Sequence, residues 1–299
     1  MRNLFDHRTI ARSFGRASTS YDAAAKIQRI ARTELLARLH NFKLKPENIL
    51  DLGAGTGAAS MALKRRYPNA NVIALDFAPA MLVTAGQHLN WRARLLSGHF
   101  SPSFLRVAGT AHKLPLKESC VDLIFSNLML QWCDNLDDVL IEIRRILAPG
   151  GVFIFSTFGP STLKELRIAF ALVDTQPHVN TFIDMHDLGS ALGRAGFQEP
   201  VLDIDRHLQK YPDVMTLLRE LKAIGAGNAM QGRSRGLTGR VRFAQMQNEY
   251  TALSDSPLSI PVTWDIIYAS SFSPQSPKFV AATGATEIKV PLNQIGWRR

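Results

Sequence analysis

One glycine-rich segment constrains the fold more than any other part of the sequence: Asp51-Leu52-Gly53-Ala54-Gly55-Thr56-Gly57. It follows an apolar run over 48–53 that is typical of a buried strand, and it leads into a helix-like stretch over 57–68. Glycines at such a junction let the backbone pass close to a ligand, because they carry no Cβ atom. The segment therefore predicts an α/β fold with a ligand site at the carboxyl end of its first strand.

Apolar bursts of strand length alternate with longer helical stretches through the first half of the chain. Further strands are predicted at 71–76, 104–109, 121–127 and 152–158, helices at 79–89 and 136–147, and a turn at Pro149-Gly150-Gly151. Strands joined by crossovers of this kind indicate a parallel sheet with helices on both faces. We therefore expect a doubly wound α/β sheet.

The pattern changes after residue 158. Helices are predicted at 161–174 and 184–197, the second capped by Asp184 and closing on Gly196, and strands at 200–208 and 263–270. We expect the long insertion between these strands to form a helical cap over one end of the sheet, together with 159–182 and a continuous helical stretch from Tyr21 to His40. The predicted divisions are N-terminal lid helices (1–46), a cofactor-binding core (47–158), cap insertions with sheet-completing strands (159–270) and a loosely packed tail (271–299).

Composition excludes several classes of protein. With 46% apolar residues and two cysteines in 299 residues, the chain is neither disordered nor held together by disulfides. No run reaches the roughly 18 apolar residues that a membrane span needs. Cys120 and Cys133 lack the spacing of a metal or redox motif, so we expect reduced thiols in a cytoplasmic protein.

The net charge of +10 comes from two segments. Residues 1–32 carry seven basic and two acidic side chains, and residues 222–242 carry five basic and no acidic ones. Such segments attract nucleic acid, an anionic membrane surface or an acidic protein, or they simply form a solvated surface. The Arg- and Ser-rich N-terminus also has the composition of a mitochondrial transit peptide, but Asp6 and the helical pattern from Tyr21 onward argue against that alternative.

Asp76 ends the predicted strand 71–76, where its carboxylate can accept hydrogen bonds from two ribose hydroxyls. Turn glycines without a ligand, and an Asp76 that caps the helix near Pro79, are the simpler alternatives. Together in this context, the loop and Asp76 predict a nucleoside-binding site. The spacing G-x-G-x-G differs from the G-x-G-x-x-G of dinucleotide folds.

With Asp51 ahead of it, D-x-G-x-G-x-G resembles the first motif of the class I S-adenosylmethionine-dependent methyltransferases. The segments 109–115, 121–132 and 147–151 are similar to later parts of that family, in order, so the resemblance covers 48–158. It implies a seven-stranded Rossmann-like methyltransferase sheet and S-adenosylmethionine as cofactor. The implied cofactor-binding residues are Asp51, Gly53, Gly55, Gly57, Asp76, Phe77, Thr110, Ala111 and Asn127.

Thr110 departs from the family pattern, because many members have an acid there that contacts the adenine amine. We therefore expect the backbone at Ala111 to make that contact. Asn127-Leu128-Met129-Leu130 also lacks the Asn/Asp-Pro-Pro-aromatic clamp of enzymes that methylate exocyclic nitrogens. A carboxylate, a thiol or a stabilised carbanion remains as acceptor, and nucleic acid is not favoured as a partner.

The second half of the chain is similar to the malonyl-[acyl-carrier protein] O-methyltransferases of biotin biosynthesis. The segments that carry this resemblance are 158–166, 178–180, 184–189, 221–226 and 236–240, with 13–17 near the N-terminus. It implies methyl transfer to the free carboxylate of a malonyl thioester on acyl carrier protein, which initiates pimeloyl synthesis. That carboxylate is ionised at neutral pH, so no general base is expected. The carrier protein is strongly acidic and would suit the basic segment 222–242.

Tyr21 is the candidate catalytic residue, closing over the cofactor and contacting the acceptor, although a packed core tyrosine is an equally simple explanation. The expected residues for substrate or carrier-protein binding are Arg219, Lys222, Asn228, Arg233, Arg235 and Arg240. No metal is expected, because helix capping explains Asp184 and its neighbours. A respiratory complex I assembly factor that hydroxylates a protein arginine, a tRNA methyltransferase and a non-catalytic protein of the same fold remain as alternatives.

Overall fold

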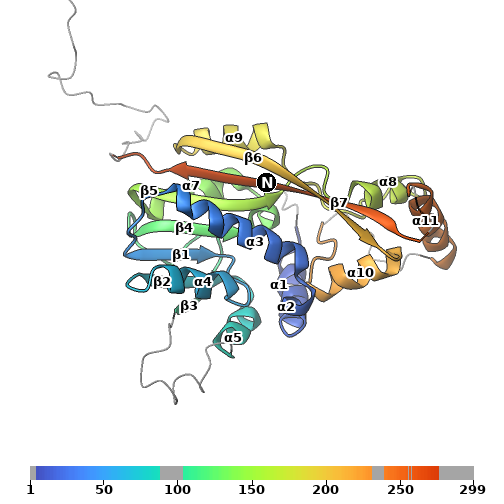
Figure 1. The fold of residues 1–299 in the computed structure, drawn as a ribbon, viewed down its shortest axis with the longest axis horizontal. Coiled ribbons are helices and arrows are strands. Elements are labelled where there is room, and N and C mark those ends of the chain that lie inside the picture. The colour runs from blue at the N-terminus through green and yellow to red at the C-terminus, as the bar shows by residue number, and fades with distance from the viewer. Residues whose placement is uncertain (1–4, 88–103, 231–238, 255, 257, 276–299) are drawn as a thin grey trace, which may run out of the picture.

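The computed structural model describes residues 5–87, 104–230, 239–254, 256 and 258–275. Their strands form one seven-stranded sheet in the order β3-β2-β1-β4-β5-β7-β6 (Figure 1). The strands are β1 (Asn48–Leu52), β2 (Asn71–Asp76), β3 (Leu105–Ala108), β4 (Val121–Asn127), β5 (Leu147–Phe158), β6 (Gln198–Tyr211) and β7 (Ile260–Phe272). The expected α/β class and the seven-stranded sheet are confirmed.

The first five strands pair in parallel, as predicted, and β7 runs antiparallel to both β5 and β6. From β1 the chain winds outward to β2 and β3 and then returns to β4 on the other side of β1. This reversal between β1 and β4 is where open parallel sheets bind ligands, at the carboxyl ends of the strands. The glycine-rich segment follows β1 at that edge.

Helices cover both faces of the sheet. They are α1 (His7–Ala17), α2 (Tyr21–Ala24), α3 (Lys26–Arg38), η1 (Leu39–Asn41), α4 (Ala58–Arg66), α5 (Pro79–Gln87), η2 (Leu130–Trp132), α7 (Leu136–Ile146), α8 (Lys164–Ala171), α9 (Met185–Arg194), α10 (Val214–Ala223) and α11 (Arg240–Ala252). One apolar core joins α3, α4 and α5 to the sheet, and a second joins α7 and α9 to its other face. Ile49 packs in the first core and Leu50 in the second, because successive side chains of a strand point to opposite faces of the sheet.

Three predicted boundaries differ from the structure. The continuous helical stretch from Tyr21 to His40 is divided at Ala25, whose ψ of 56° interrupts helical hydrogen bonding between α2 and α3. The turn predicted at Pro149-Gly150-Gly151 lies inside β5, where the register against β4 shifts between Val121 and Leu123 and absorbs the extra residues. The strand predicted at 263–270 is longer at both ends, because β7 runs from Ile260 to Phe272, and residues 276–299 of the predicted tail lie outside the described part of the chain.

The α9 prediction is confirmed at both ends. Asp184 caps the helix by accepting a hydrogen bond from the His186 N–H at 2.8 Å, and Gly196 follows it with a φ of +82°. A left-handed residue just after a helix satisfies its last carbonyls, and glycine adopts that conformation without strain. The prediction that Asp184 caps this helix is therefore confirmed.

The N-terminal helix α1 is part of the folded domain. Ile10 packs with Phe5 and Ala229 in a small apolar cluster, and the Asp6 N–H donates to the Ala229 carbonyl at 3.0 Å. A transit peptide would be cut away from the mature protein, which this packing does not fit. In the described ranges, no helix is long and apolar enough to cross a membrane.

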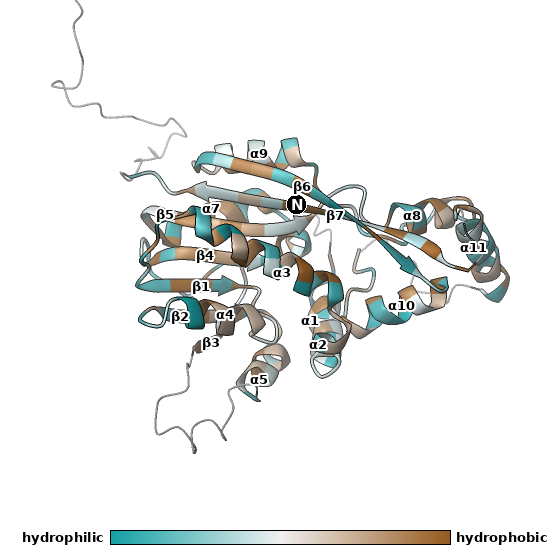
Figure 2. Ribbon diagram, in the orientation of Figure 1, coloured by the Kyte–Doolittle hydropathy of each residue, from teal (hydrophilic) through white to brown (hydrophobic). Residues whose placement is uncertain are grey.

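Strands β6 and β7 extend beyond the rest of the sheet. β7 pairs with β5 only from Ile266 onward, whereas its pairing with β6 begins at Ile260. Helices α8, α10 and α11 gather around this two-stranded arm at one end of the molecule (Figure 1). Figure 2 shows apolar residues in the central strands β1 and β4 and polar stretches on α11. The insertions predicted as a cap thus lie together, while the exact divisions at 46, 158 and 270 stay a prediction.

A buried carboxylate fastens α8 to this arm. Glu165 is 6% exposed, and its two oxygens accept hydrogen bonds from the Thr263 hydroxyl and from the Thr263 N–H, the latter at 3.0 Å. Both Thr263 groups are buried with it. Without the carboxylate, they would lose their partners away from water.

We expect Glu165→Met to lower the free energy of unfolding by about 1–3 kcal/mol, because it leaves the Thr263 N–H and hydroxyl unpaired. Urea unfolding followed by circular dichroism measures the change. Glu249→Met, at an exposed position of α11, is the control and should stay within about 0.5 kcal/mol of the unmodified protein. Equal effects at both positions would show that the Glu165 bonds add nothing to stability.

Candidate active site

The glycine-rich segment forms an open loop between β1 and α4. Gly53, Gly55 and Gly57 all have positive φ, at 78°, 54° and 78°. A Cβ atom at Gly57 would come within 2.8 Å of the Phe104 ring, so that glycine allows close packing, whereas a Cβ atom at Gly55 would meet nothing within 4 Å. The backbone at Gly55 is therefore accessible to a ligand, as the sequence predicted.

Asp76 stands at the end of β2 and holds this loop. One carboxylate oxygen accepts from the Gly55 N–H at 2.8 Å and the other from the Ala78 N–H at 2.8 Å. Each oxygen can accept a further hydrogen bond, which suits the two hydroxyls of a ribose. Burial raises the pKa of Asp76, and hydrogen bonds from the Ala78, Gly55 and Phe77 amides oppose that rise.

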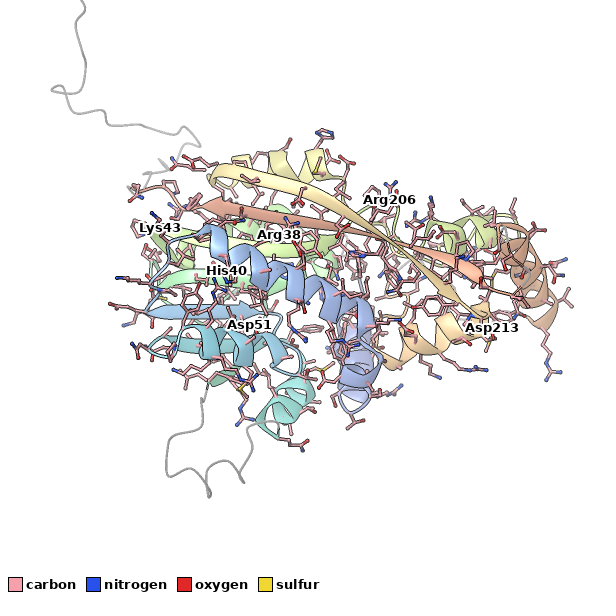
Figure 3. The ribbon with its side chains drawn as sticks, in the orientation of Figure 1. Arg38, His40, Lys43, Asp51, Arg206 and Asp213 are labelled. Carbon is pink, nitrogen blue, oxygen red and sulfur yellow. The ribbon has the colours of Figure 1, made fainter. Side chains whose placement is uncertain are left out.

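Asp51, labelled in Figure 3, lies deeper, at 1% exposure. It accepts a hydrogen bond from the Ser60 hydroxyl. Burial raises the pKa of Asp51 to about 7, an effect that the hydrogen bonds from Ser60 oppose. The Asp76 carboxylate adds to the rise and the Arg32 guanidinium opposes it. The first acidic residue of the motif can therefore exist in either protonation state near neutral pH.

The N-terminal helices close over the loop. The Thr56 hydroxyl donates to Asp22 Oδ1 at 2.6 Å, which ties α2 to the glycine-rich segment. Desolvation raises the pKa of Tyr21, and the carboxylates of Asp76 and Asp22 add to that effect. Desolvation lowers the pKa of Arg32, and the carboxylates of Asp22 and Asp51 oppose that shift.

Asp22 and Arg32 were missed in the sequence. Asp22 could have been found, because it follows Tyr21 in the Tyr-Asp pair that carried part of the resemblance. Nothing in the sequence singled out Arg32. The catalytic role of Tyr21 stays a prediction.

The other predicted cofactor residues lie at the same edge of the sheet. Phe77 meets the Phe14 ring edge-on at 6.2 Å, Ala111 is buried, and Thr110 is exposed with its hydroxyl 3.4 Å from the His112 amide. Asn127 uses both ends of its amide within the protein, accepting from the Ser156 hydroxyl at 2.9 Å and donating to the Gln28 carbonyl at 3.1 Å. Its direct contact with a cofactor stays a prediction.

A cavity of about 550 Å³ lies beside this edge. Its apolar walls come from four parts of the chain, represented by Trp132, Phe158, Leu166 and Leu221. Aromatic contacts connect it to the loop region, because the Phe14 ring packs edge-on against Trp132 at 5.3 Å and against Phe77. A substrate in this cavity would therefore lie next to a ligand on the loop.

Two exposed cations line the cavity, Arg16 of α1 and Lys222 of α10. His178 also lines it, but its ring stacks on Phe170 with 3.8 Å between centroids and its Nε2 pairs with Asp174 at 2.8 Å. In the part of the chain that the structure describes, no group of three His, Cys, Asp or Glu side chains could hold a metal. The cavity thus combines apolar walls with positive charge at exposed positions.

The residues predicted to bind substrate or partner separate into three groups. Lys222 and Asn228 line the cavity, and the Asn228 amide is engaged with the Pro177 carbonyl and the Met230 N–H. Arg219 and Arg240 are exposed and are not among the lining residues. Arg233 and Arg235 lie outside the described residues.

The fold is similar to that of two solved bacterial structures. The YcgJ protein from Bacillus subtilis aligns with a TM-score of 0.56 at 14% identity, covering 82% of this chain and 100% of its own. A putative methyltransferase from Bacillus halodurans aligns with a TM-score of 0.53 at 14% identity, covering 80% of this chain and 98% of its own. At such low identity these similarities establish the fold alone.

Sequence comparison is more specific. A family described as "Methyltransferase domain" matches residues 50–155. The protein named malonyl-[acyl-carrier protein] O-methyltransferase from Methylovorus sp. is 44% identical over 91% of this chain and 91% of its own. The protein of the same name from Xylella fastidiosa is 43% identical over 100% of this chain and 99% of its own. With this identity over nearly its whole length, the chain belongs to the malonyl-[acyl-carrier protein] O-methyltransferase family of S-adenosylmethionine-dependent enzymes.

Proposed function

We propose that this enzyme methylates the free carboxylate of a malonyl thioester carried by acyl carrier protein. The observation that carries the proposal is the apolar cavity of about 550 Å³ beside the glycine-rich loop, in a chain whose relatives bear that name. We also propose that it acts in the bacterial cytoplasm, since these relatives are bacterial and both cysteines are free thiols. The names of these relatives favour methylation of malonyl-carrier protein over arginine hydroxylation or tRNA methylation.

The loop residues fit S-adenosylmethionine. Gly55 leaves its backbone open to a ligand, and Asp76 keeps acceptor positions for two ribose hydroxyls. When bound, this cofactor supplies a methyl group on a positively charged sulfur, and its transfer to a carboxylate oxygen leaves a neutral thioether and a methyl ester without moving a proton. Asp51, Asp76, Phe77 and the Ala111 backbone would hold it.

The chain's contribution to rate would come from positioning and from exclusion of water. A malonyl carboxylate is already ionised at neutral pH, so it needs no base. The described residues that line the cavity include no Asp or Glu, which would repel that charge. Apolar walls strip water from the carboxylate and hold it in one orientation, and both effects bring it closer to the transition state.

The basic surface would recognise the carrier protein. Lys222 lines the cavity from α10, and Arg240 and Arg242 are exposed on α11 at the same end of the molecule (Figure 1). An acidic partner meeting this end would bring its attached malonyl group to the cavity. Charge complementarity of this kind acts mainly on the rate of encounter and weakens as salt is added. A mass gain of one methylene on malonyl-carrier protein, dependent on S-adenosylmethionine, is the direct test of the activity.

Asp76→Ala should weaken S-adenosylhomocysteine binding by about 1–3 kcal/mol, roughly tenfold or more, because it removes two buried acceptors and releases the Gly55 amide. Isothermal titration calorimetry measures the affinity. Asp122→Ala is the matched control: Asp122 accepts from the Glu47 and Asn48 amides at the opposite edge of the sheet, so its loss should leave binding unchanged. Binding of the Asp76→Ala variant within twofold of wild type would contradict the nucleoside site.

Asp51 should make that affinity depend on pH. The pKa of Asp51 is about 7, so its neutral form prevails below that pH. If the ammonium group of S-adenosylhomocysteine binds beside Asp51, it would favour the carboxylate form. Affinity should therefore fall as the pH drops through about 7, by up to about tenfold per unit. Calorimetry between about pH 6 and about pH 8 tests this, and Asp51→Asn should bind more weakly with a flat profile. A sloping profile in Asp51→Asn would assign the titration to another group.

Reversal of Arg240 and Arg242 to glutamate should lower kcat/KM for malonyl-carrier protein about tenfold at low salt and flatten its salt dependence. Turnover of malonyl-coenzyme A should change little, because neither residue lines the cavity. Lys43→Glu with Lys45→Glu changes the net charge by the same amount at the other end of the molecule. Figure 3 shows Lys43 at that end, far from Asp213, the residue that caps α10. A similar loss in this control would mean that net charge, and not the α11 surface, governs the encounter.

A further inference from the structure

Gln28 of α3 is a buried side chain of the cavity lining whose amide oxygen has no partner among the described residues. It is 8% exposed, it lines the cavity, and its Oε1 makes no hydrogen bond within the described part of the chain. Two other buried polar side chains of the lining are paired: the Thr162 hydroxyl donates to the Asp265 carbonyl at 2.9 Å, and Asn180 Oδ1 accepts from the Ala229 amide at 3.4 Å. The indole N–H of Trp264 also has no partner among the described residues, but it can only donate, whereas an amide can donate or accept. A buried polar group without a partner is costly, so this amide is suited to a ligand.

Backbone hydrogen bonds hold Gln28 at the carboxyl edge of the sheet. Its carbonyl accepts from Asn127 Nδ2 at 3.1 Å, at the end of β4. The neighbouring Ser126 hydroxyl donates to the Leu52 carbonyl at 2.8 Å, one residue before Gly53. Gln28 therefore lies in the part of the cavity that adjoins the glycine-rich loop, where an acceptor atom must be for methyl transfer.

The charged groups of the cavity lie elsewhere. Arg16 and Lys222 are exposed, and His178 is paired with Asp174. An amide supplies two N–H donors and no charge, and a half-turn about its last side-chain bond exchanges the places of its oxygen and nitrogen. A neutral donor can hold one carboxylate oxygen without neutralising the charge that makes the other reactive.

We propose that Gln28 binds the carboxylate of the acceptor through its Nε2 and so selects a free carboxylate over its methyl ester. This inference rests on the proposed function. It accounts for product release as well, because an ester oxygen carries no net charge and is a weaker hydrogen-bond acceptor than a carboxylate oxygen.

The test compares two ligands that differ only at this group: malonyl-carrier protein and its methyl ester, each titrated with S-adenosylhomocysteine present. Gln28→Met keeps the length of the side chain and removes the amide, so it should weaken malonyl-carrier protein about tenfold to hundredfold and the ester less than twofold. Gln28→Glu should weaken malonyl-carrier protein further than Gln28→Met does, because it places a like charge beside the acceptor carboxylate. S-adenosylhomocysteine affinity and melting temperature are measured for each variant.

Gln131→Met is the matched control, because both ends of that amide are engaged within the protein, with the Leu128 carbonyl and the Thr157 hydroxyl. It should leave the ratio of the two affinities unchanged, whatever it does to stability. Equal losses on both ligands in Gln28→Met and Gln28→Glu, or no loss on either, would overturn the assignment of Gln28 while wild-type turnover still supports the function. If the wild type does not methylate malonyl-carrier protein at all, both proposals fail.

Discussion

The hydrogen bond from the Gly55 N–H to the Asp76 carboxylate is the contact on which the site depends. It joins the loop after β1 to the end of β2, strands that are already neighbours in the sheet. The loop can take this path because its glycines accept positive φ. Asp76 is therefore both a part of the loop's support and the group offered to the ribose, so the site is preorganised before a ligand arrives.

This arrangement places two carboxylates in a region with little water. Burial raises the pKa values of Asp51 and Asp76, and the Asp76 carboxylate makes ionisation of Asp51 more costly. The Arg32 guanidinium from α3 offsets part of that cost. Besides covering the loop, the N-terminal helices supply a positive charge, Arg32, that favours the ionised form of Asp51.

The acceptor cavity differs from the loop because its interior is apolar and its charged side chains lie at exposed positions. Its walls come from the N-terminal helices α1 and α3, from Trp132 and Phe158 near the sheet, and from α8 and α10, which pack on the β6–β7 arm. Apolar walls surround a neutral amide near the loop, and cations occupy exposed positions. Separating an uncharged interior from a basic exterior lets one enzyme desolvate a small carboxylate and attract a large acidic partner.

The sequence by itself determined the parallel sheet, the loop and the position of Asp76, because strand and helix periods and glycine-rich turns are local properties of the chain. It also carried the family resemblance, and the caps of α9 followed from adjacent residues. Only the tertiary structure decided the roles of Gln28, Asp22 and Arg32. These side chains come from helices that have ordinary amphipathic patterns, and their surroundings are set by strands as distant in sequence as β4 and β5. Burial, pairing and pKa depend on neighbours in space, which a local pattern does not specify.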